Sequence, residues 1–262
     1  MSEMSDQGAV RYRRDGAVAH VTFDRPAARN AMTWAMYEQL GTACERIASE
    51  RDVRAAVLRG AGGKAFVAGT DIAQFTQFKS GADGIEYERR VSAYLAPLEN
   101  LPVPTLAVIE GWAIGGGLAI AAVCDLRIAT PGSRFGVPIA RTLGNCLSIG
   151  NHALLVAAFG LARTKKMLLL AQNLTAEEAL TSGFLAEIVA TEALEKRIVE
   201  ITDRLAGNAP VTMRVTKESI RRLLKAGFPQ DEDLIRTCYG SRDFQIGVES
   251  FVAKREPRWT GE

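Results

Sequence analysis

The sequence predicts an α/β fold built from buried strands, glycine turns and helices. The apolar run at residues 104–109 leads to Gly115, Gly116 and Gly117, and a helical stretch over residues 118–123 follows. A strand-like run at residues 54–59 and a glycine turn at residues 60–63 repeat this order before a helix start within residues 64–75. Because strands that alternate with helices are typical of α/β domains, these two units predict the fold class.

The triple glycine is also a candidate site. Consecutive glycines are costly inside a helix or strand, but they let the backbone approach a ligand closely. A helix that begins there directs its free N–H groups and positive dipole end at the turn, which suits an oxyanion. A close-packed crossover from strand to helix is the alternative interpretation.

Length and composition limit the other possibilities. The 262 residues suffice for one large α/β domain, or for a core with a small C-terminal helical domain, and the net charge of +2 gives no global attraction to nucleic acid. Residues 1–8 lack the apolar segment of a signal peptide, and no long apolar stretch predicts a membrane span, so a soluble cytoplasmic protein is expected. We predict no metal site and no disulfide, because the cysteines and histidines are widely spaced: Cys44, Cys124, Cys146, Cys238, His20 and His152.

The N-terminal half begins with strand-like runs at residues 10–14 and 17–23, around the hairpin signal Asp15-Gly16. Pro26 then ends the sheet, because proline has no N–H to donate, and Thr33 is the expected cap of a helix over residues 34–47. Residues 76–83 predict a loop before a helix over residues 85–98. The polar run on that helix, residues 86–89, is expected to form its solvated face.

The C-terminal half is mainly helical. Strand-like segments at residues 125–129 and 134–137 precede an irregular stretch at residues 138–151. Further on, a capping box that begins at Thr175 starts a helix over residues 175–182, after another over residues 162–171 and before a short strand at 185–189. Four more helices are expected over residues 192–206, 210–226, 231–239 and 241–254, and their apolar stripes predict packing against a neighbour.

Several short motifs occur in one order along nearly the whole chain: Asp24-Arg25-Pro26, Arg29-Asn30-Ala31, Ala65-Phe66-Val67-Ala68-Gly69-Thr70-Asp71-Ile72, Gly115-Gly116-Gly117 and Cys124-Asp125. In this order they resemble the crotonase superfamily, also called the enoyl-CoA hydratase/isomerase family. The resemblance implies the crotonase (ClpP-like) fold of repeated ββα units. It also implies a core domain over residues 1–200 and a C-terminal helical trimerisation region over residues 201–262, in a homotrimer or a dimer of trimers.

The resemblance further implies an oxyanion hole. Two backbone N–H groups, which here belong to Thr70 and Gly116, would bind the thioester carbonyl of an acyl-CoA substrate. Such donors stabilise a developing enolate or tetrahedral oxyanion, by about 2.7–4 kcal/mol for one donor. Coenzyme A would enter as part of the substrate, with no separate cofactor. The residues that match the family's coenzyme A contacts are Arg25, Arg29, Lys64, Ala65, Phe66, Ala68, Asp71 and Ile72, with Phe251 and Lys254 from the next subunit.

The sequence departs from this family at two positions. Hydratases of the family use two glutamates, and the matching positions here are Ala119 and Ile139. Neither side chain can transfer a proton, so efficient hydration of simple enoyl-CoA substrates is not expected.

The irregular stretch nearby is unusually polar and could hold a relocated site. Arg141 could pair with an anionic acyl substituent, Asn145 could orient a carboxylate or water, and Cys146 could act as a nucleophile if its thiolate were stabilised. The alternatives are loop capping for the polar residues and simple burial for Cys146. For His152 the choice is between a base and a packed residue.

These observations favour an acyl-CoA enzyme that stabilises a thioester enolate or oxyanion. A malonyl-type acyl-CoA decarboxylase and an enoyl-CoA isomerase are alternatives within the family, and decarboxylation needs few proton-transfer groups. The other class is a non-catalytic homologue that binds acyl-CoA or RNA. The near-neutral charge argues against RNA, because phosphate contacts require a clustered basic surface.

Overall fold

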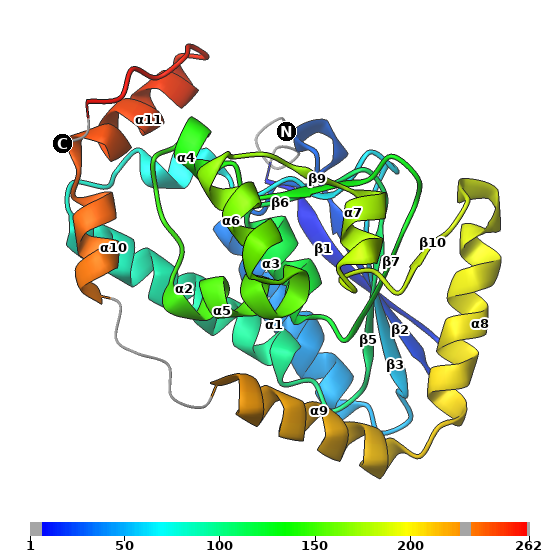
Figure 1. The fold of residues 1–262 in the computed structure, drawn as a ribbon. Coiled ribbons are helices and arrows are strands. Elements are labelled where there is room, and N and C mark those ends of the chain that lie inside the picture. The colour runs from blue at the N-terminus through cyan, green and yellow to red at the C-terminus, as the bar shows by residue number, and fades with distance from the viewer. Residues whose placement is uncertain (1–6, 226–231, 261–262) are drawn as a thin grey trace, which may run out of the picture.

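Two β-sheets organise the chain in the computed structural model, which describes residues 7–225 and 232–260 (Figure 1). The six-stranded sheet consists, in spatial order, of β1 (Ala9–Asp15), β2 (Val18–Asp24), β3 (Ala55–Gly60), β5 (Thr105–Ile109), β7 (Leu126–Ala129) and β10 (Glu187–Ile188). The four-stranded sheet consists of β4 (Ala65–Val67), β6 (Trp112–Ile114), β8 (Arg134–Gly136) and β9 (Leu174–Thr175).

Successive ββα units build both sheets. The pair β3 and β4 is followed by α2 (Gly81–Glu99), and the pair β5 and β6 is followed by α3 (Gly116–Val123). The pair β7 and β8 leads to α4 (Ile139–Thr142) and α5 (Ile149–Phe159). Strands of successive units pair in parallel in each sheet, as crossover connections require. The repeated ββα architecture predicted from the sequence is therefore confirmed.

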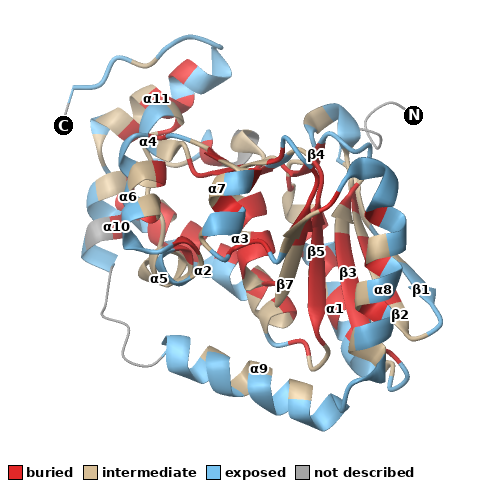
Figure 2. Cartoon of the chain, turned by 45° about the vertical axis from the view of Figure 1, so that its right-hand side comes forward, coloured by how far each residue is buried: buried red, intermediate tan, exposed pale blue. Residues whose placement is uncertain are grey.

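Helices cover both faces of the six-stranded sheet (Figure 1). Helices α1 (Trp34–Ser49), α2 and α3 lie on one side and enclose the larger apolar core. Helix α8 (Leu194–Gly207) lies on the other side, where Leu194 and Ile198 pack against Val57 and Leu106. Every residue of β5 is buried, as expected for a central parallel strand covered on both faces (Figure 2).

Several local predictions are confirmed. β1 and β2 form an antiparallel hairpin around the predicted turn, with Asp15 opposite Val18. The Thr33 hydroxyl accepts a hydrogen bond from Met36 N–H at the start of α1, and Thr175 opens a capping box before α7 (Ala176–Thr181). Each of these features depends on neighbouring residues alone, which explains why the sequence was sufficient to predict it.

Other boundaries differ from the prediction. Helix α2 begins at Gly81 rather than at residue 85, and Ser80 and Asp83 form a capping box at its start. A Cβ atom at Gly81 would collide with the backbone of Arg236, and one at Gly84 would collide with the ring of Tyr239. These glycines therefore let two helices approach closely, although glycine usually indicates a loop. The strands β6 and β9 and the short helix α4 were also not predicted, and all three are at most four residues long.

The last two helices fold back over the core. Helices α10 (Glu232–Tyr239) and α11 (Arg242–Val252) bury Ile235, Tyr239, Phe244 and Val248 against α2 and the 3-10 helix η2 (Ile72–Phe75). The predicted helix end at Ala226 and helix start at Asp231 lie outside the described residues. The remaining elements are η1 (Pro26–Ala28), α6 (Leu161–Leu169), η3 (Thr191–Ala193) and α9 (Pro210–Lys225).

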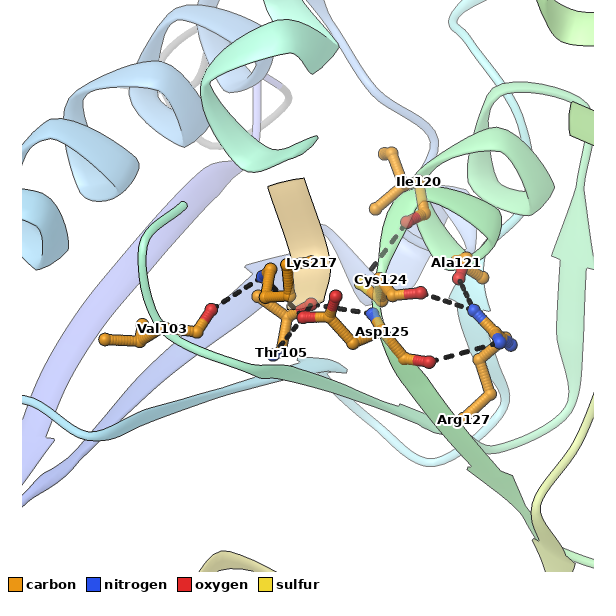
Figure 3. A network of polar contacts seen from close by, with 8 residues as sticks. All are labelled: Val103, Thr105, Ile120, Ala121, Cys124, Asp125, Arg127 and Lys217. Carbon is orange, nitrogen blue, oxygen red and sulfur yellow. Dashed lines mark hydrogen bonds and ion pairs between the residues drawn. The ribbon is translucent and has the colours of Figure 1, made fainter. Parts of the chain in front are cut away.

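Helix α9 is attached to the core by a polar network and buries none of its own residues (Figures 2 and 3). Lys217 Nζ donates to Asp125 Oδ2 at 2.5 Å and to the Val103 carbonyl at 2.7 Å. Asp125 also accepts hydrogen bonds from the N–H and hydroxyl of Thr105. Nearby, Arg127 donates to the carbonyls of Ala121 and Cys124 at the end of α3. Across the described residues, no helix is both long and apolar enough to cross a membrane.

Candidate active site

A pocket of about 180 Å³ lies at the N-terminal end of α3. The turn after β4, the turn after β6, helix α2 and the segment around α4 supply its walls. Its lining is mostly apolar, and the polar groups that face it come from a few residues: Thr70, Gly116, Tyr87, Glu88, Thr142, Asn145 and Asn151. A mainly apolar cavity with a few convergent polar groups is the usual form of a small-molecule site.

Backbone geometry brings Thr70 and Gly116 together in this pocket. Met32 N–H donates to Gly69 O, and Asp71 N–H donates to Met32 O, at 2.9 and 2.8 Å. In such a parallel bridge the residue between the two bonds, Thr70, directs its own N–H away from Met32. Gly116 is the first residue of α3, where N–H groups have no partner within the helix. A Cβ atom at Gly116 would lie only 3.7 Å from Thr70 N, so the two turns are neighbours.

Tyr37 of α1 contacts the turn that contains Thr70 through a hydrogen bond between the two side chains. Its phenolic oxygen lies 2.9 Å from Thr70 Oγ1, and the side chain is fully buried. Burial raises the pKa of Tyr37 to about 12, so the hydroxyl remains protonated near neutral pH. The same oxygen would be 2.6 Å from a Cβ atom at Gly116. Tyr37 therefore fixes the Thr70 side chain close to the start of α3, and only glycine at position 116 leaves room for both.

The position of Glu88 on α2 differs from the predicted solvated face of that helix. Glu86 and Arg89 are exposed as expected, but Tyr87 and Glu88 are buried and line the pocket, and Glu88 is only 4% exposed. Glu88 Oε2 accepts a hydrogen bond from Ser148 N–H at 2.9 Å, and Glu88 Oε1 accepts one from the Tyr239 hydroxyl at 3.0 Å. Burial raises the pKa of Glu88, and these two hydrogen bonds oppose that shift.

The sequence did contain a signal for this burial. Glu88 lies three residues after Ile85 and three before Val91, and both are buried in the core. Positions three apart share one face of a helix. A periodicity count on α2 would therefore have placed Glu88 on the apolar face rather than on the wet one.

Asn145 shares a polar cluster with Glu88. Asn145 Nδ2 donates to Tyr239 Oη at 3.4 Å, and Tyr239 Oη also lies 3.3 Å from the Cys146 carbonyl. Asn145 Oδ1 is buried and has no hydrogen-bond partner within the described part of the chain. Buried polar atoms are normally paired, so this oxygen is an unsatisfied acceptor in a residue that lines the pocket.

Comparison with known proteins identifies the family. A model of the family described as enoyl-CoA hydratase/isomerase matches residues 13–262. The chain belongs to this family. It is 31% identical to the short-chain-enoyl-CoA hydratase of Clostridium acetobutylicum, over 93% of this chain and 94% of that protein. It is 27% identical to the 2,3-dehydroadipyl-CoA hydratase of Escherichia coli, over 95% and 97% of the two chains. This hydratase/isomerase family member is therefore an enzyme of the crotonase superfamily.

Solved structures agree with this assignment. A methylmalonyl-CoA decarboxylase in complex with 2-nitronate-propionyl-CoA superposes with a TM-score of 0.89 at 26% identity, over 97% of this chain and 98% of that one. An enoyl-CoA hydratase/carnithine racemase from Magnetospirillum magneticum gives a TM-score of 0.78 at 31% identity, over 97% and 96%. The predicted crotonase fold is confirmed.

The two positions that the resemblance matches to the glutamates of hydratases both line the pocket. Ala119 of α3 and Ile139 of α4 are lining residues. Their location agrees with the resemblance, and the apolar side chains leave those two walls without a proton-transfer group.

The other residues predicted to take part in catalysis do not all lie at the pocket. Arg141 is exposed and is not among the residues that line the pocket. Cys146 is partly buried and also does not line the pocket, although its hydrogen bond with Cys238 lowers the pKa of the Cys238 thiol. His152 Nδ1 lies 3.0 Å from the Ser148 carbonyl, one turn earlier in α5. Of these predicted residues, Asn145 lines the same pocket as Thr70 and Gly116, and Arg141 does not.

The predicted coenzyme A residues occupy several environments. Ala68 and Ile72 line the pocket, whereas Ala65 and Phe66 are buried within β4. Phe251 of α11 lines the pocket of its own chain. The exposed predicted cations are Arg29, Lys64 and Lys254.

Arg25 and Asp71 were both predicted to contact coenzyme A, and they pair with each other. Arg25 Nη1 donates to Asp71 Oδ2 at 2.7 Å, and the Arg25 side chain is only 11% exposed. Arg25 also donates to the Ala31 carbonyl. This ion pair holds the segment after β2 against the turn that contains Thr70. As for metals, residues 7–225 and 232–260 contain no group of three or more His, Cys, Asp or Glu side chains that could hold an ion.

Proposed function

We propose that this enzyme binds an acyl-CoA thioester and stabilises an enolate or oxyanion at its carbonyl through the N–H groups of Thr70 and Gly116. The observation that carries the proposal is the close approach of these two turns at the start of α3. Hydrogen bonds from preorganised donors to an oxyanion are stronger in an apolar pocket, because water does not compete for the oxyanion there. Each such donor lowers the activation free energy by about 2.7–4 kcal/mol.

Efficient hydration of a simple enoyl-CoA is not part of this proposal. Hydration requires one group to activate water and one to protonate the α-carbon, and Ala119 and Ile139 occupy the positions of the two family glutamates. Relatives named as hydratases share the fold and about 30% of the sequence, but this pocket lacks their expected pair of acids. The chemistry therefore fits a reaction that passes through an enolate and needs fewer proton-transfer groups. Double-bond isomerisation is one such reaction, because a single group can remove a proton from one carbon and return it to another.

Decarboxylation of a malonyl-type thioester is the second candidate. A methylmalonyl-CoA decarboxylase is among the solved structures that resemble this chain, with a TM-score of 0.89. Loss of CO₂ from such a substrate creates the enolate directly, so no base is needed to form it. An apolar pocket also favours loss of a carboxylate, because the charge becomes delocalised into the enolate that the N–H groups bind. Arg141 is exposed and does not line the pocket, so its predicted pairing with an anionic acyl substituent finds no support.

Substrate binding and assembly complete the proposal. We expect Lys64, exposed just before β4, to contact the phosphates of coenzyme A as a point charge. We expect the region over residues 201–262 to form a homotrimer or a dimer of trimers, because α9 exposes apolar side chains: Val211, Val215, Ile220, Leu223 and Leu224. A cytoplasmic location stays a prediction.

One experiment distinguishes these reactions. The enzyme is incubated with a panel of enoyl, malonyl-type and aroyl CoA thioesters, and the products are identified by mass spectrometry. We expect turnover of a malonyl-type or isomerisable thioester and only traces of hydrated product. Tight binding of every thioester without turnover would instead indicate the non-catalytic acyl-CoA binding protein.

A further inference from the structure

Glu88 carries the one carboxyl group among the residues that line the described pocket. We propose that Glu88 is the acid–base group of this enzyme, and that it exchanges a proton with the α-carbon of the bound thioester. The proposal rests on the function proposed above, because it uses the oxyanion site at Thr70 and Gly116. It places the proton-transfer group on α2, away from the positions of both family glutamates at Ala119 and Ile139.

The surroundings of Glu88 can accommodate both its charged and its neutral form. The Tyr239 hydroxyl has two acceptors in reach, Glu88 Oε1 at 3.0 Å and the Cys146 carbonyl at 3.3 Å. When Glu88 is ionised, the Tyr239 proton lies toward the carboxylate. When Glu88 is protonated on Oε1, the carboxyl proton lies toward Tyr239 Oη, and the Tyr239 proton turns to the Cys146 carbonyl. A hydroxyl rotor can make this change without movement of heavy atoms.

The groups around Glu88 come from four parts of the chain. Tyr37 faces it from α1, Tyr87 is its neighbour on α2, and Tyr239 and Cys238 face it from α10. At the start of α5, Ser148 hydrogen-bonds to Glu88 through its N–H and its side chain, and the side chain of Asn151 is a further hydrogen-bond partner. None of these groups is a cation, so burial raises the pKa of Glu88 above that of an exposed glutamate. A raised value moves the carboxyl toward neutral pH, where a group that both accepts and donates a proton is most effective.

The chemistry balances with this single group. The ionised carboxylate removes the α-proton, the electrons of the C–H bond form the enolate, and the negative charge moves to the thioester oxygen. The reverse step returns the proton to carbon and restores the carboxylate. In decarboxylation, the C–C bond breaks, CO₂ leaves, and neutral Glu88 donates its proton to the α-carbon of the enolate before it is reprotonated by water. Hydration would require a second group to activate water.

Exchange of α-hydrogen tests the proposal without knowledge of the natural acyl group. Butyryl-CoA is incubated with the enzyme in D₂O, and deuterium uptake is followed by mass spectrometry. Deuterium enters the substrate when the protonated carboxyl exchanges its hydrogen with the solvent before the reverse step. We expect Glu88→Gln to slow enzyme-catalysed exchange by about 10²–10⁴-fold, the usual contribution of a positioned acid–base group. Glu86→Gln is the matched control, since Glu86 lies on the same helix and is exposed. This control should exchange at the wild-type rate.

The pH dependence separates catalysis from a structural role. Exchange needs the ionised carboxylate, so its rate should rise with pH through the pKa of Glu88 and then level off. Tyr239→Phe removes a hydrogen bond that stabilises the carboxylate, so the midpoint of this rise should move to higher pH. Because Tyr239→Phe leaves Glu88 in place, it also tests the proposal if Glu88→Gln does not fold.

The outcomes distinguish this inference from the proposed function. If exchange is abolished by Gly116→Ala but unchanged by Glu88→Gln, Glu88 is not the acid–base group and the oxyanion site stands. A pH midpoint that is the same in wild type and Tyr239→Phe likewise overturns the role of Glu88. If wild-type enzyme binds butyryl-CoA by calorimetry and shows no exchange at any pH but decarboxylates a malonyl-type thioester, Glu88 is not the base and the oxyanion site stands. If it shows neither exchange nor turnover of any thioester, both proposals are wrong.

Discussion

Adding one methyl group at Gly116 should damage the chemistry of the pocket far more than the fold. The new Cβ atom would lie 2.6 Å from Tyr37 Oη and 2.7 Å from Thr70 Oγ1. Tyr37 is fully buried and its oxygen already bonds to Thr70 at 2.9 Å, so it cannot simply rotate away. The contact is relieved only if both the Tyr37 hydroxyl and the Thr70 side chain move away from α3, because Cβ atoms essentially never lie under 3.0 Å from a non-bonded atom. Overpacking of this kind costs about 1–3 kcal/mol of stability.

The expected melting temperature follows from that cost. A change of 1 kcal/mol lowers Tm by about 2–4 °C in a chain of roughly this size, so Gly116→Ala should melt about 2–12 °C below wild type. Gly41→Ala is the matched control, because Gly41 is also helical and a Cβ atom there meets no atom within 4 Å. That substitution should leave Tm unchanged or raise it slightly, since alanine favours helix by about 1 kcal/mol.

The effect on catalysis should be larger. Donors of an oxyanion hole must lie about 2.7–3.1 Å from the oxyanion, and loss of one donor lowers kcat by about 10²–10³-fold. Deuterium exchange into butyryl-CoA should therefore fall by that factor in Gly116→Ala, while Gly41→Ala retains the wild-type rate. Folded Gly116→Ala protein with an unchanged exchange rate would refute the reasoning, because it would mean that no oxyanion is held between position 116 and Thr70.

Three further predictions concern binding, reaction type and attachment of α9. Lys64→Ala should weaken coenzyme A binding in calorimetry, and the difference from wild type should shrink at high salt because an exposed charge is screened; equal affinities would remove Lys64 from the site. Crotonyl-CoA should be hydrated well below the common enzyme range of about 1–10³ s⁻¹, and the double variant Ala119→Glu, Ile139→Glu should raise that rate only if water fits beside the alkene. Lys217→Met should lower the free energy of unfolding, measured with denaturant, by about 1–3 kcal/mol. This is less than the loss expected when a fully buried ion pair is broken, because Lys217 and Asp125 are both partly exposed. The surface pair of Lys225 is the control, and Lys225→Met should cost under about 1 kcal/mol.

The sequence predicted the parts of the fold that local chemistry determines. The hairpin after Asp15, the cap at Thr33 and the capping box at Thr175 each depend on a few adjacent residues. The glycines of α2 show the limit of such rules. Gly81 and Gly84 resemble loop residues when read along the chain, and their role is visible only when α10 lies against them. Packing between segments about 150 residues apart leaves no local signal.

The candidate site shows the same limit. The turns at Thr70 and Gly116 were predicted because a family resemblance covers them, and Ala119 and Ile139 were identified by the same comparison. Glu88 was assigned to the solvated face of its helix because charged runs usually lie there. The burial of Glu88 depends on Tyr239. The Tyr239 hydroxyl donates a hydrogen bond to Glu88 Oε1, and this bond offsets part of the cost of burying the carboxyl group.

This dependence joins the two ends of the chain in one site. The sequence suggests a division near residue 200, with a core before it and helices for assembly after it. The pocket, however, takes Thr70, Glu88 and Gly116 from the first part and Phe251 from the second, and Tyr239 supplies the partner of Glu88. A carboxyl buried beside an apolar cavity without that partner would lose a compensating hydrogen bond, at a cost of about 1–3 kcal/mol. The C-terminal helices therefore contribute to the pocket of their own chain, through Phe251 and through the hydrogen bond from Tyr239 to Glu88.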